Sequence, residues 1–350
     1  MSSKLKYYTS LDGLRALAAI GVIVAHFFSI ERIKDNPILI KITQQGNSGV
    51  SLFFVLSGFV ITRILLNTVN NNRYFSNFYG RRTLRIFPLY YLGLIVYNFL
   101  PYALGLKYSS ISFSKLWYYY AYIQNIARTF NWDSVGPNHY WSLAVEEHFY
   151  LIWPAIVYFL YRKNKKGLFL ISVFFIVLAF LLRAYMINKG YEINVFTLTR
   201  VDQLSLGCIL ALLESKGYLN LKAKKYFVII AIVGLLFVFY SATFDYFNLN
   251  LYKHSAYGLL YFGLIGYCIT ANFNSLLNRF LNLKGVQFLG KISYGIYIWH
   301  MIVILLVESY FNINSLVIQF LLIMIFTIAI SAMSYYFFEM KFLKLKRYFE

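Results

Sequence analysis

Residues 11–28 read LDGLRALAAIGVIVAHFF, an apolar stretch that is long enough to cross a lipid bilayer as a helix. It carries Asp12 and Arg15 near one end and His26 near the other. Ionisable side chains are costly at membrane depth, so they point to a functional site there. Arg15 and His26 are eleven positions apart, and an α-helix places them on nearly the same face, roughly 16 Å apart along its axis. We therefore expect this face to line an internal cavity, with a fixed cation at one level and a titratable imidazole at the other.

The composition of the whole chain is typical of a helical membrane protein. Hydrophobic residues make up 60% of the 350 residues and charged residues only 13%, and the mean hydropathy is +0.59. Apolar runs of around 20 residues recur along the sequence, as membrane-spanning helices require. Cys208 and Cys268 lie far apart in apolar stretches, which predicts packed thiols and no disulfide or metal site. We predict an all-α membrane protein with ten spans, at residues 9–29, 49–66, 86–105, 139–161, 168–187, 200–215, 226–243, 254–271, 287–308 and 316–339.

The distribution of basic residues predicts the orientation of these spans. With both chain termini in the cytoplasm, the cytoplasmic segments hold 21 of the 33 Lys and Arg residues and the opposite side holds 8. The remaining four lie within or at the ends of spans: Arg15, Arg183, Arg200 and Lys291. This asymmetry is what the positive-inside rule expects. The net charge of +20 is thus explained by topology and by anionic membrane lipids, and it does not indicate nucleic-acid binding.

The stretch 106–138 is amphipathic and contains WYYYAYIQNI in its middle. Counting it as a further span would place the following helices on the wrong side of the membrane. We therefore predict a re-entrant or interfacial segment, whose aromatic side chains suit the membrane–water boundary.

Two neighbouring carboxylates, Glu146 and Glu147, lie in the outer half of the fourth predicted span, within HYWSLAVEEHFYLIWP. They are expensive in a membrane unless they face a polar cavity or a partner. One of them can orient the imidazole of His26, because a carboxylate fixes the tautomer and raises the basicity of the ring. The alternative is a structural ion pair with Arg183 or Arg200. Adjacent helical residues point about 100° apart, so one Glu can serve each purpose.

The stretch GRRTLRIFPLY places Arg82 and Arg85 on one helix face, with Arg81 beside them. Guanidinium groups bind phosphate oxygens bidentately and hold their charge at any pH. The alternative is ordinary positive-inside charge. In the second span, Ser57 and Gly58 allow close approach of a thin ligand or of another helix, and packing by small residues is the alternative.

The later spans add further polar side chains. The stretch KISYGIYIWHMIVI places Tyr294, Tyr297 and His300 on one helix, and His300 is either a hydrogen-bonded structural residue or part of the expected cavity. Arg200 and Asp202, near the outer end of the sixth span, predict an ion pair that positions the helix end.

Five motifs in order resemble the acyltransferase-3 family of membrane acyltransferases, which commonly O-acetylate surface carbohydrates. They cover nearly the whole chain, although Glu339 is followed by Met340 and Lys341 where many members have Glu-x-Pro. The matching residues are Arg15 and His26 after the lead-in LDGLRALAA, Ser57-Gly58-Phe59, Arg82 and Arg85 in RRTLRIFPLYY, the pattern Trp141, Ser142, Glu146, Phe149 and Pro154, and the stretch from Ser293 to His300.

The resemblance implies an O-acyltransferase that takes an acyl group, by default acetyl, from acyl-CoA on the cytoplasmic side. The acceptor is a hydroxyl of a polysaccharide or a lipid-linked glycan, and the enzyme is a multi-pass protein of the cell inner (cytoplasmic) membrane. The phosphates of CoA rest on Arg82 and Arg85, with Arg15 near them and Ser57 and Gly58 beside the donor. His26 and one of the two glutamates carry the chemistry.

In this interpretation, residues 1–350 form a single transmembrane acyltransferase domain without a soluble domain. His26 either removes the proton of the acceptor hydroxyl or takes the acyl group covalently. The supporting residues are Asp12, Tyr294, Tyr297, His300, Trp141, Arg200 and Asp202. The alternative from another class is a transporter that exports a glycan or a small metabolite. It explains the spans, but it explains the arginine pair, the glutamate pair and the spaced Arg–His face less economically.

Overall fold

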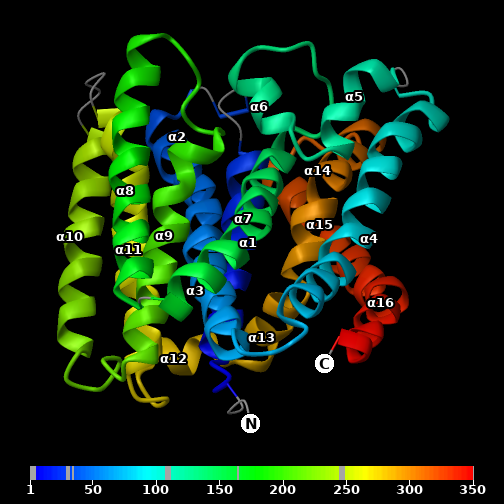
Figure 1. The fold of residues 1–350 in the computed structure, drawn as a ribbon. Coiled ribbons are helices and arrows are strands. Elements are labelled where there is room, and N and C mark those ends of the chain that lie inside the picture. The colour runs from blue at the N-terminus through cyan, green and yellow to red at the C-terminus, as the bar shows by residue number, and fades with distance from the viewer. Residues whose placement is uncertain are drawn as a thin grey trace.

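The computed structural model describes residues 5–28, 32–33, 35–106, 112–163, 165–243 and 249–349. Within these ranges the chain is helical and contains no β-strand, as predicted. Residues 107–111 of the expected interfacial segment, and the basic residues Lys4, Lys34 and Lys107, lie outside the described part. The helices stand side by side in one bundle (Figure 1).

The described residues form sixteen α-helices, of which several are short. They are α1 Ser10–Phe27, α2 Pro37–Gln44, α3 Gly49–Thr68, α4 Tyr74–Ala103, α5 Phe113–Tyr120, α6 Gln124–Thr129, α7 Trp141–Lys163, α8 Lys165–Asn188, α9 Thr197–Ser215, α10 Lys224–Thr243, α11 Leu249–Thr270, α12 Leu276–Leu281, α13 Lys284–Lys291, α14 Ser293–Tyr310, α15 Leu316–Met333 and α16 Met340–Lys344. Four short turns of tighter or wider helix complete the structure: η1 Gln45–Ser48, η2 Asn138–Tyr140, η3 Ser334–Glu339 and η4 Leu345–Phe349.

Eight helical stretches of the described residues are long and apolar enough to cross a membrane: Ser10–Phe27, Pro37–Thr68, Tyr74–Ala103, Asn138–Tyr161, Lys166–Asn188, Lys224–Ser241, Ser293–Tyr310 and Leu316–Phe349. The long helices α9 and α11 overlap the two other predicted spans and pack within the same bundle. The fold class is therefore confirmed, while the count of ten and the cytoplasmic position of the termini stay predictions.

Two predicted spans differ from the helices that form. The span predicted at 287–308 is broken at Ile292, because the amphipathic α13 ends at Lys291 and α14 begins at Ser293. The third span begins earlier than predicted, since α4 runs from Tyr74 through the arginine-rich stretch and continues past Pro88. As a result Arg82 and Arg85 lie on the same continuous helix as the membrane-spanning part.

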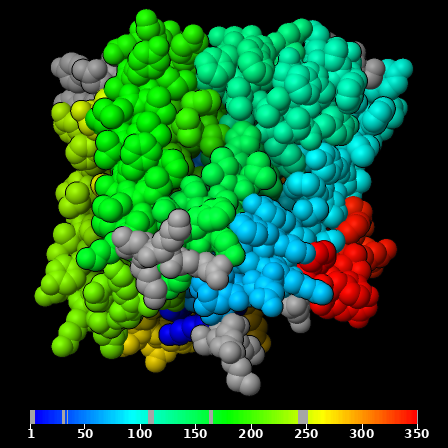
Figure 2. Space-filling view, viewed as in Figure 1, coloured from blue at the N-terminus to red at the C-terminus, as the bar shows by residue number. Residues whose placement is uncertain are grey.

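Helix α1 is the central element of the bundle. It packs against α3, α11, α13 and α14. Of its 18 residues 11 are buried, and Leu14, Ile23 and Phe27 are fully enclosed. Seen from the side drawn in Figure 2, the green and cyan parts of the chain lie in front of the dark blue N-terminal segment, which is visible only at the lower edge. Two of the polar residues of α1 point into the protein: Arg15 lines an internal cavity, and His26 contacts His300 of α14.

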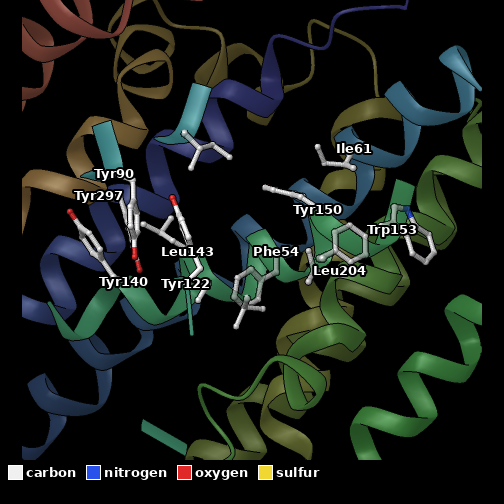
Figure 3. Packing of buried hydrophobic residues seen from close by; sticks show 14 of the residues in the cluster. Phe54, Ile61, Tyr90, Tyr122, Tyr140, Leu143, Tyr150, Trp153, Leu204 and Tyr297 are labelled. Atoms are coloured by element: carbon white, nitrogen blue, oxygen red, sulfur yellow. The ribbon is translucent and has the colours of Figure 1, made fainter. Parts of the chain in front are cut away.

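The segment that follows α4 lies at one end of the bundle, opposite the two chain termini (Figure 1). It is anchored by aromatic stacking and by hydrogen bonds. The rings of Tyr90 and Tyr122 stack at 4.1 Å, and the Tyr90 hydroxyl donates to the carbonyl of Tyr119 at 2.7 Å. Figure 3 shows Tyr90, Tyr122, Tyr140 and Tyr297 gathered on one side of the buried core. These contacts fix the point at which η2 leads into α7.

Candidate active site

A cavity of about 510 Å³ lies between α1, α3, α4, α7 and α14. Leu5, Arg81 and Lys346, which belong to segments at the end of the bundle where the chain begins and ends, form one part of its lining. Its other lining residues are Arg15, Val50, Phe53, Phe54, Ser57, Val60, Ile64, Asn67, Thr68, Phe78, Arg82, Arg85, Ile86, Ser142, Leu143, Glu146, Glu147, Tyr150, Ser293, Tyr294 and Tyr297. This volume is in the range of sites for small molecules and cofactors.

Five cationic side chains line this cavity: Arg15, Arg81, Arg82, Arg85 and Lys346. Arg82 and Arg85 face it together, as their spacing on one helix predicts. Arg15 donates to Asp12 at 2.6 Å, so one of the five charges is balanced by a neighbouring carboxylate. The remaining positive charge makes this part of the cavity suitable for a ligand with several phosphate groups.

The two glutamates of α7 also face the cavity. Ser57 donates its hydroxyl hydrogen to Glu146 at 2.6 Å, and the Tyr150 hydroxyl donates to Ser57 at 3.0 Å. The guanidinium of Arg82 lies 5.1 Å from the centre of the Tyr150 ring. Glu146 is thus satisfied inside a polar cavity that also holds cations, whereas Glu147 Oε1 is buried without a hydrogen-bond partner among the described residues. Neither glutamate forms an ion pair with Arg183 or Arg200 in the described part of the chain.

The expected pairing of a glutamate with His26 does not form. His26 Nδ1 instead lies 2.8 Å from Nε2 of His300, with the two rings stacked at 5.1 Å. Glu146 instead accepts from Ser57, which in turn accepts from Tyr150. The sequence could not reveal this, because the rotation of α7 and α14 about their axes decides which side chain meets His26.

The hydrogen bonds of His300 determine the tautomer of His26. Nδ1 of His300 lies 2.8 Å from the carbonyl oxygen of Tyr297, and a carbonyl only accepts, so this nitrogen carries the hydrogen. In a neutral pair, Nε2 of His300 is then an acceptor, and Nδ1 of His26 donates to it. The lone pair on Nε2 of His26 is left free. His300 is fully buried, whereas His26 retains partial exposure.

A third imidazole, that of His139 in η2, completes a cluster with His26 and His300. Its ring centre lies 4.8 Å from that of His300 and 6.2 Å from that of His26. His139 is not among the site residues expected from the sequence. The available signal was a histidine at the outer end of a predicted span, two positions before Trp141.

The cavity stops short of this histidine cluster. At its inner end Ser142 donates to the Tyr297 hydroxyl at 2.6 Å, and Tyr297 donates to the backbone carbonyl of His139 at 2.6 Å. His26 lies beyond this hydroxyl pair and is not part of the described lining, so the expectation that Arg15 and His26 line one continuous cavity is only half correct. Arg15 lines the cavity, whereas His26 contacts His139 and His300, whose rings both lie against Tyr297.

The predicted ion pair between Arg200 and Asp202 is wrong. Asp202 accepts from Arg183 at 2.9 Å in a pair whose side chains are 1% and 0% exposed. Arg200 donates to Ser51 at 3.1 Å, and its guanidinium lies 5.4 Å from the ring centres of both Trp141 and Phe54. Residues two positions apart on a helix point about 200° apart, so Arg200 and Asp202 of α9 contact different neighbours.

Gly58 and Tyr294 are placed differently from each other. Gly58 packs against the backbone of α9 at Leu204 and lies outside the described cavity lining, so small-residue packing is the role that the structure shows. Tyr294 lines the cavity and donates to the carbonyl of Ile86 at 2.9 Å.

Cys208 and Cys268 are free and buried, as predicted.

These features define a multi-pass membrane protein with a cation-lined cavity that ends beside a group of imidazoles. The chain belongs to the Acyl_transf_3 family of acyltransferase domains, whose model matches residues 8–336. The resemblance of the five motifs is thereby confirmed.

Two relatives illustrate the similarity. The chain is 29% identical to the O-acetyltransferase OatA of Staphylococcus aureus, over 95% of this chain and 57% of the relative. It is 31% identical to the peptidoglycan O-acetyltransferase OatA of Listeria monocytogenes, over 89% of this chain and 51% of the relative. The chain thus spans a little over half the length of these curated relatives. No solved structure matches it.

Proposed function

We propose that this protein transfers an acetyl group from acetyl-CoA, bound from the cytoplasmic side, to a hydroxyl of a carbohydrate at the outer side of the cell membrane. Membership of an acyltransferase family supports acyl transfer in general. The names of the relatives, an O-acetyltransferase and a peptidoglycan O-acetyltransferase, make acetyl the first donor group and peptidoglycan the first acceptor to test. A single observation carries the proposal: a cavity rich in cations ends one side chain away from a cluster of imidazoles.

The shape and charge of the cavity suit CoA. Arg82, Arg85 and Lys346 offer charged donors for its phosphate groups near the chain-terminal end. The slender pantetheine arm follows the apolar walls formed by Phe54 and Val50. The thioester then lies at the Ser142–Tyr297 end, next to the histidines. The orientation with the termini in the cytoplasm, as the distribution of basic residues predicts, places the phosphates where acyl-CoA is available.

His26 is suited to act as the general base. Its Nε2 carries a free lone pair because Nδ1 donates to His300, and its partial exposure leaves it accessible to an acceptor. His300 thereby takes the orienting role that we expected of a glutamate. Alternatively, the same Nε2 attacks the thioester and carries the acetyl group covalently. Labelled acetyl-CoA without acceptor distinguishes the two routes: a labelled His26 peptide supports the covalent one.

The deciding experiment measures turnover of radiolabelled acetyl-CoA by protein purified in detergent, with and without peptidoglycan fragments. We expect transfer or slow hydrolysis without a sealed membrane, which a transporter would not show. His26→Ala should lower the rate by about 10²–10⁴, the contribution of a general base. Normal turnover in this variant would refute the assignment of His26. The absence of any acetyl-CoA turnover or binding by the wild-type protein would refute the proposed function itself.

A further inference from the structure

His139 has two polar atoms that the surrounding protein does not satisfy. Its side chain is buried, with the residue 5% exposed. The backbone of Tyr297 and Ile298 lies near the ring, but neither Nδ1 nor Nε2 makes a hydrogen bond of regular geometry with any described residue. A neutral imidazole always carries one N–H donor and one acceptor nitrogen. Leaving both unpaired in a buried position costs free energy, and such groups in native proteins call for an explanation.

The position of His139 offers that explanation. Its ring lies 5.4 Å from the ring of Tyr297, which lines the inner end of the cavity, and 6.2 Å from the ring of His26. A thioester that leaves the end of the cavity toward His26 therefore passes beside His139. The other two imidazoles are engaged with each other, through His26 Nδ1 and His300 Nε2.

We propose that His139 is a catalytic residue whose neutral imidazole N–H donates to the oxyanion that forms on the thioester carbonyl. This inference rests on the proposed function and assigns the part of that reaction which His26 and His300 leave open. Acyl transfer needs a donor aimed at the developing negative charge, and such donors act most strongly in a site that excludes water.

The step balances with the groups present. The acceptor oxygen forms a bond to the thioester carbon and gives its proton to Nε2 of His26, while the C=O electron pair moves onto the oxygen beside His139. When the C=O bond forms again, the C–S bond breaks. The departing thiolate takes the proton from the His26 imidazolium, so that no further reactant is needed.

The backbone holds His139 in place for this role. The carbonyl oxygen of His139 accepts from the Tyr297 hydroxyl at 2.6 Å, and the ring stands edge-on to those of Tyr140, Tyr297 and His300. A donor that is fixed before the reaction pays no reorganisation cost during it, which is the condition for strong oxyanion stabilisation.

The test compares His139→Phe, which keeps a ring and removes the N–H, with His139→Gln, which keeps an N–H donor. For acetyl-CoA turnover by the purified protein, we expect His139→Phe to lower kcat by about 10²–10³ with KM for acetyl-CoA unchanged, as for loss of one oxyanion donor. His139→Gln should recover at least about tenfold of that loss. His148→Phe, a matched change at a histidine that contacts Thr197 outside the cavity, should leave kcat unchanged.

A second substitution protects the test against misfolding. Incorporation of Nδ1-methylhistidine at position 139 keeps the imidazole but removes the N–H of its neutral form, and it should match His139→Phe in kcat. Wild-type kcat in either the phenylalanine or the methylhistidine variant would overturn the proposal. Equal losses in the phenylalanine and glutamine variants, together with a lowered melting temperature, would also overturn it, because they indicate a structural role. If the wild-type protein itself fails to turn over acetyl-CoA, the proposed function fails, and the His139 variants play no part in that result.

Discussion

Replacing His300 with phenylalanine tests the hydrogen bond that is inferred to set the tautomer of His26. In the structure His300 Nδ1 is bound to the Tyr297 carbonyl at 2.8 Å, and Nε2 faces His26 Nδ1 at 2.8 Å. Phenylalanine keeps an aromatic ring in this fully buried position but offers no acceptor. His26 Nδ1–H then loses its partner, and the ring escapes the penalty by rotating or by moving its hydrogen to Nε2. Both responses take the free lone pair away from the substrate.

The size of the effect follows from that penalty. An unsatisfied buried donor costs about 1–3 kcal/mol, and 1.36 kcal/mol corresponds to a factor of ten in rate. We therefore expect His300→Phe to lower kcat by about 5- to 150-fold, with KM for acetyl-CoA nearly unchanged, because the cavity lining does not include His300. The loss should be smaller than that of His26→Ala, which removes the base altogether.

The assay is steady-state acetyl-CoA turnover by the two single variants and by the double variant. If His300 acts only through His26, the double variant should be no slower than His26→Ala, since residues that act as a unit give non-additive losses. Losses that multiply in the double variant would show that His300 contributes independently and would refute the tautomer argument.

Two further predictions concern the cavity and the bundle. Changing Arg82 to Lys keeps the charge but removes the guanidinium fork that binds phosphate bidentately. It should therefore raise KM for acetyl-CoA by about tenfold or more at unchanged kcat, and Arg85→Lys should do the same. Calorimetric titration of the protein with CoA provides a second measurement of the affinity. Asp202→Asn breaks an ion pair in which Arg183 is fully buried, and it should destabilise the protein by about 3–5 kcal/mol. The control is Asp133→Asn, which breaks the exposed pair with Lys115, where the side chains are 73% and 44% exposed; this change should cost about 1 kcal/mol or less. Melting in detergent compares the two, and equal shifts would contradict the argument from burial.

The arrangement of the site explains why the motifs alone gave only part of it. The i, i+3 spacing of Arg82 and Arg85 is a local property, so any helix places both side chains on one face, whatever packs around it. In the structure both line the cavity. The partner of His26, in contrast, is not determined by local spacing along the chain. His300 lies 274 positions away in the chain, and only the rotation and depth of α14 against α1 decide whether it or a glutamate of α7 meets the imidazole.

The same distinction applies to the charges of α9. Arg200 and Asp202 are two positions apart and seemed a natural pair, but helical geometry turns them to different neighbours. Asp202 meets Arg183 of α8, and Arg200 lies between the rings of Phe54 and Trp141. A pairing that depends on which helices are adjacent in space cannot be read from spacing along one of them.

The sequence by itself determined the class of the molecule, the approximate positions of most spans, the basic face of α4 and the placement of Arg15 and His26 on one helix. These depend on hydropathy over about 20 residues and on the 3.6-residue period, which are local properties of the chain. Only the tertiary structure decided that His300 and His139 lie beside His26, that Glu146 bonds to Ser57, and that the cavity lining includes Tyr297 but none of these three histidines. Such contacts join residues far apart in sequence, and they are set by how the side chains of packed helices interlock.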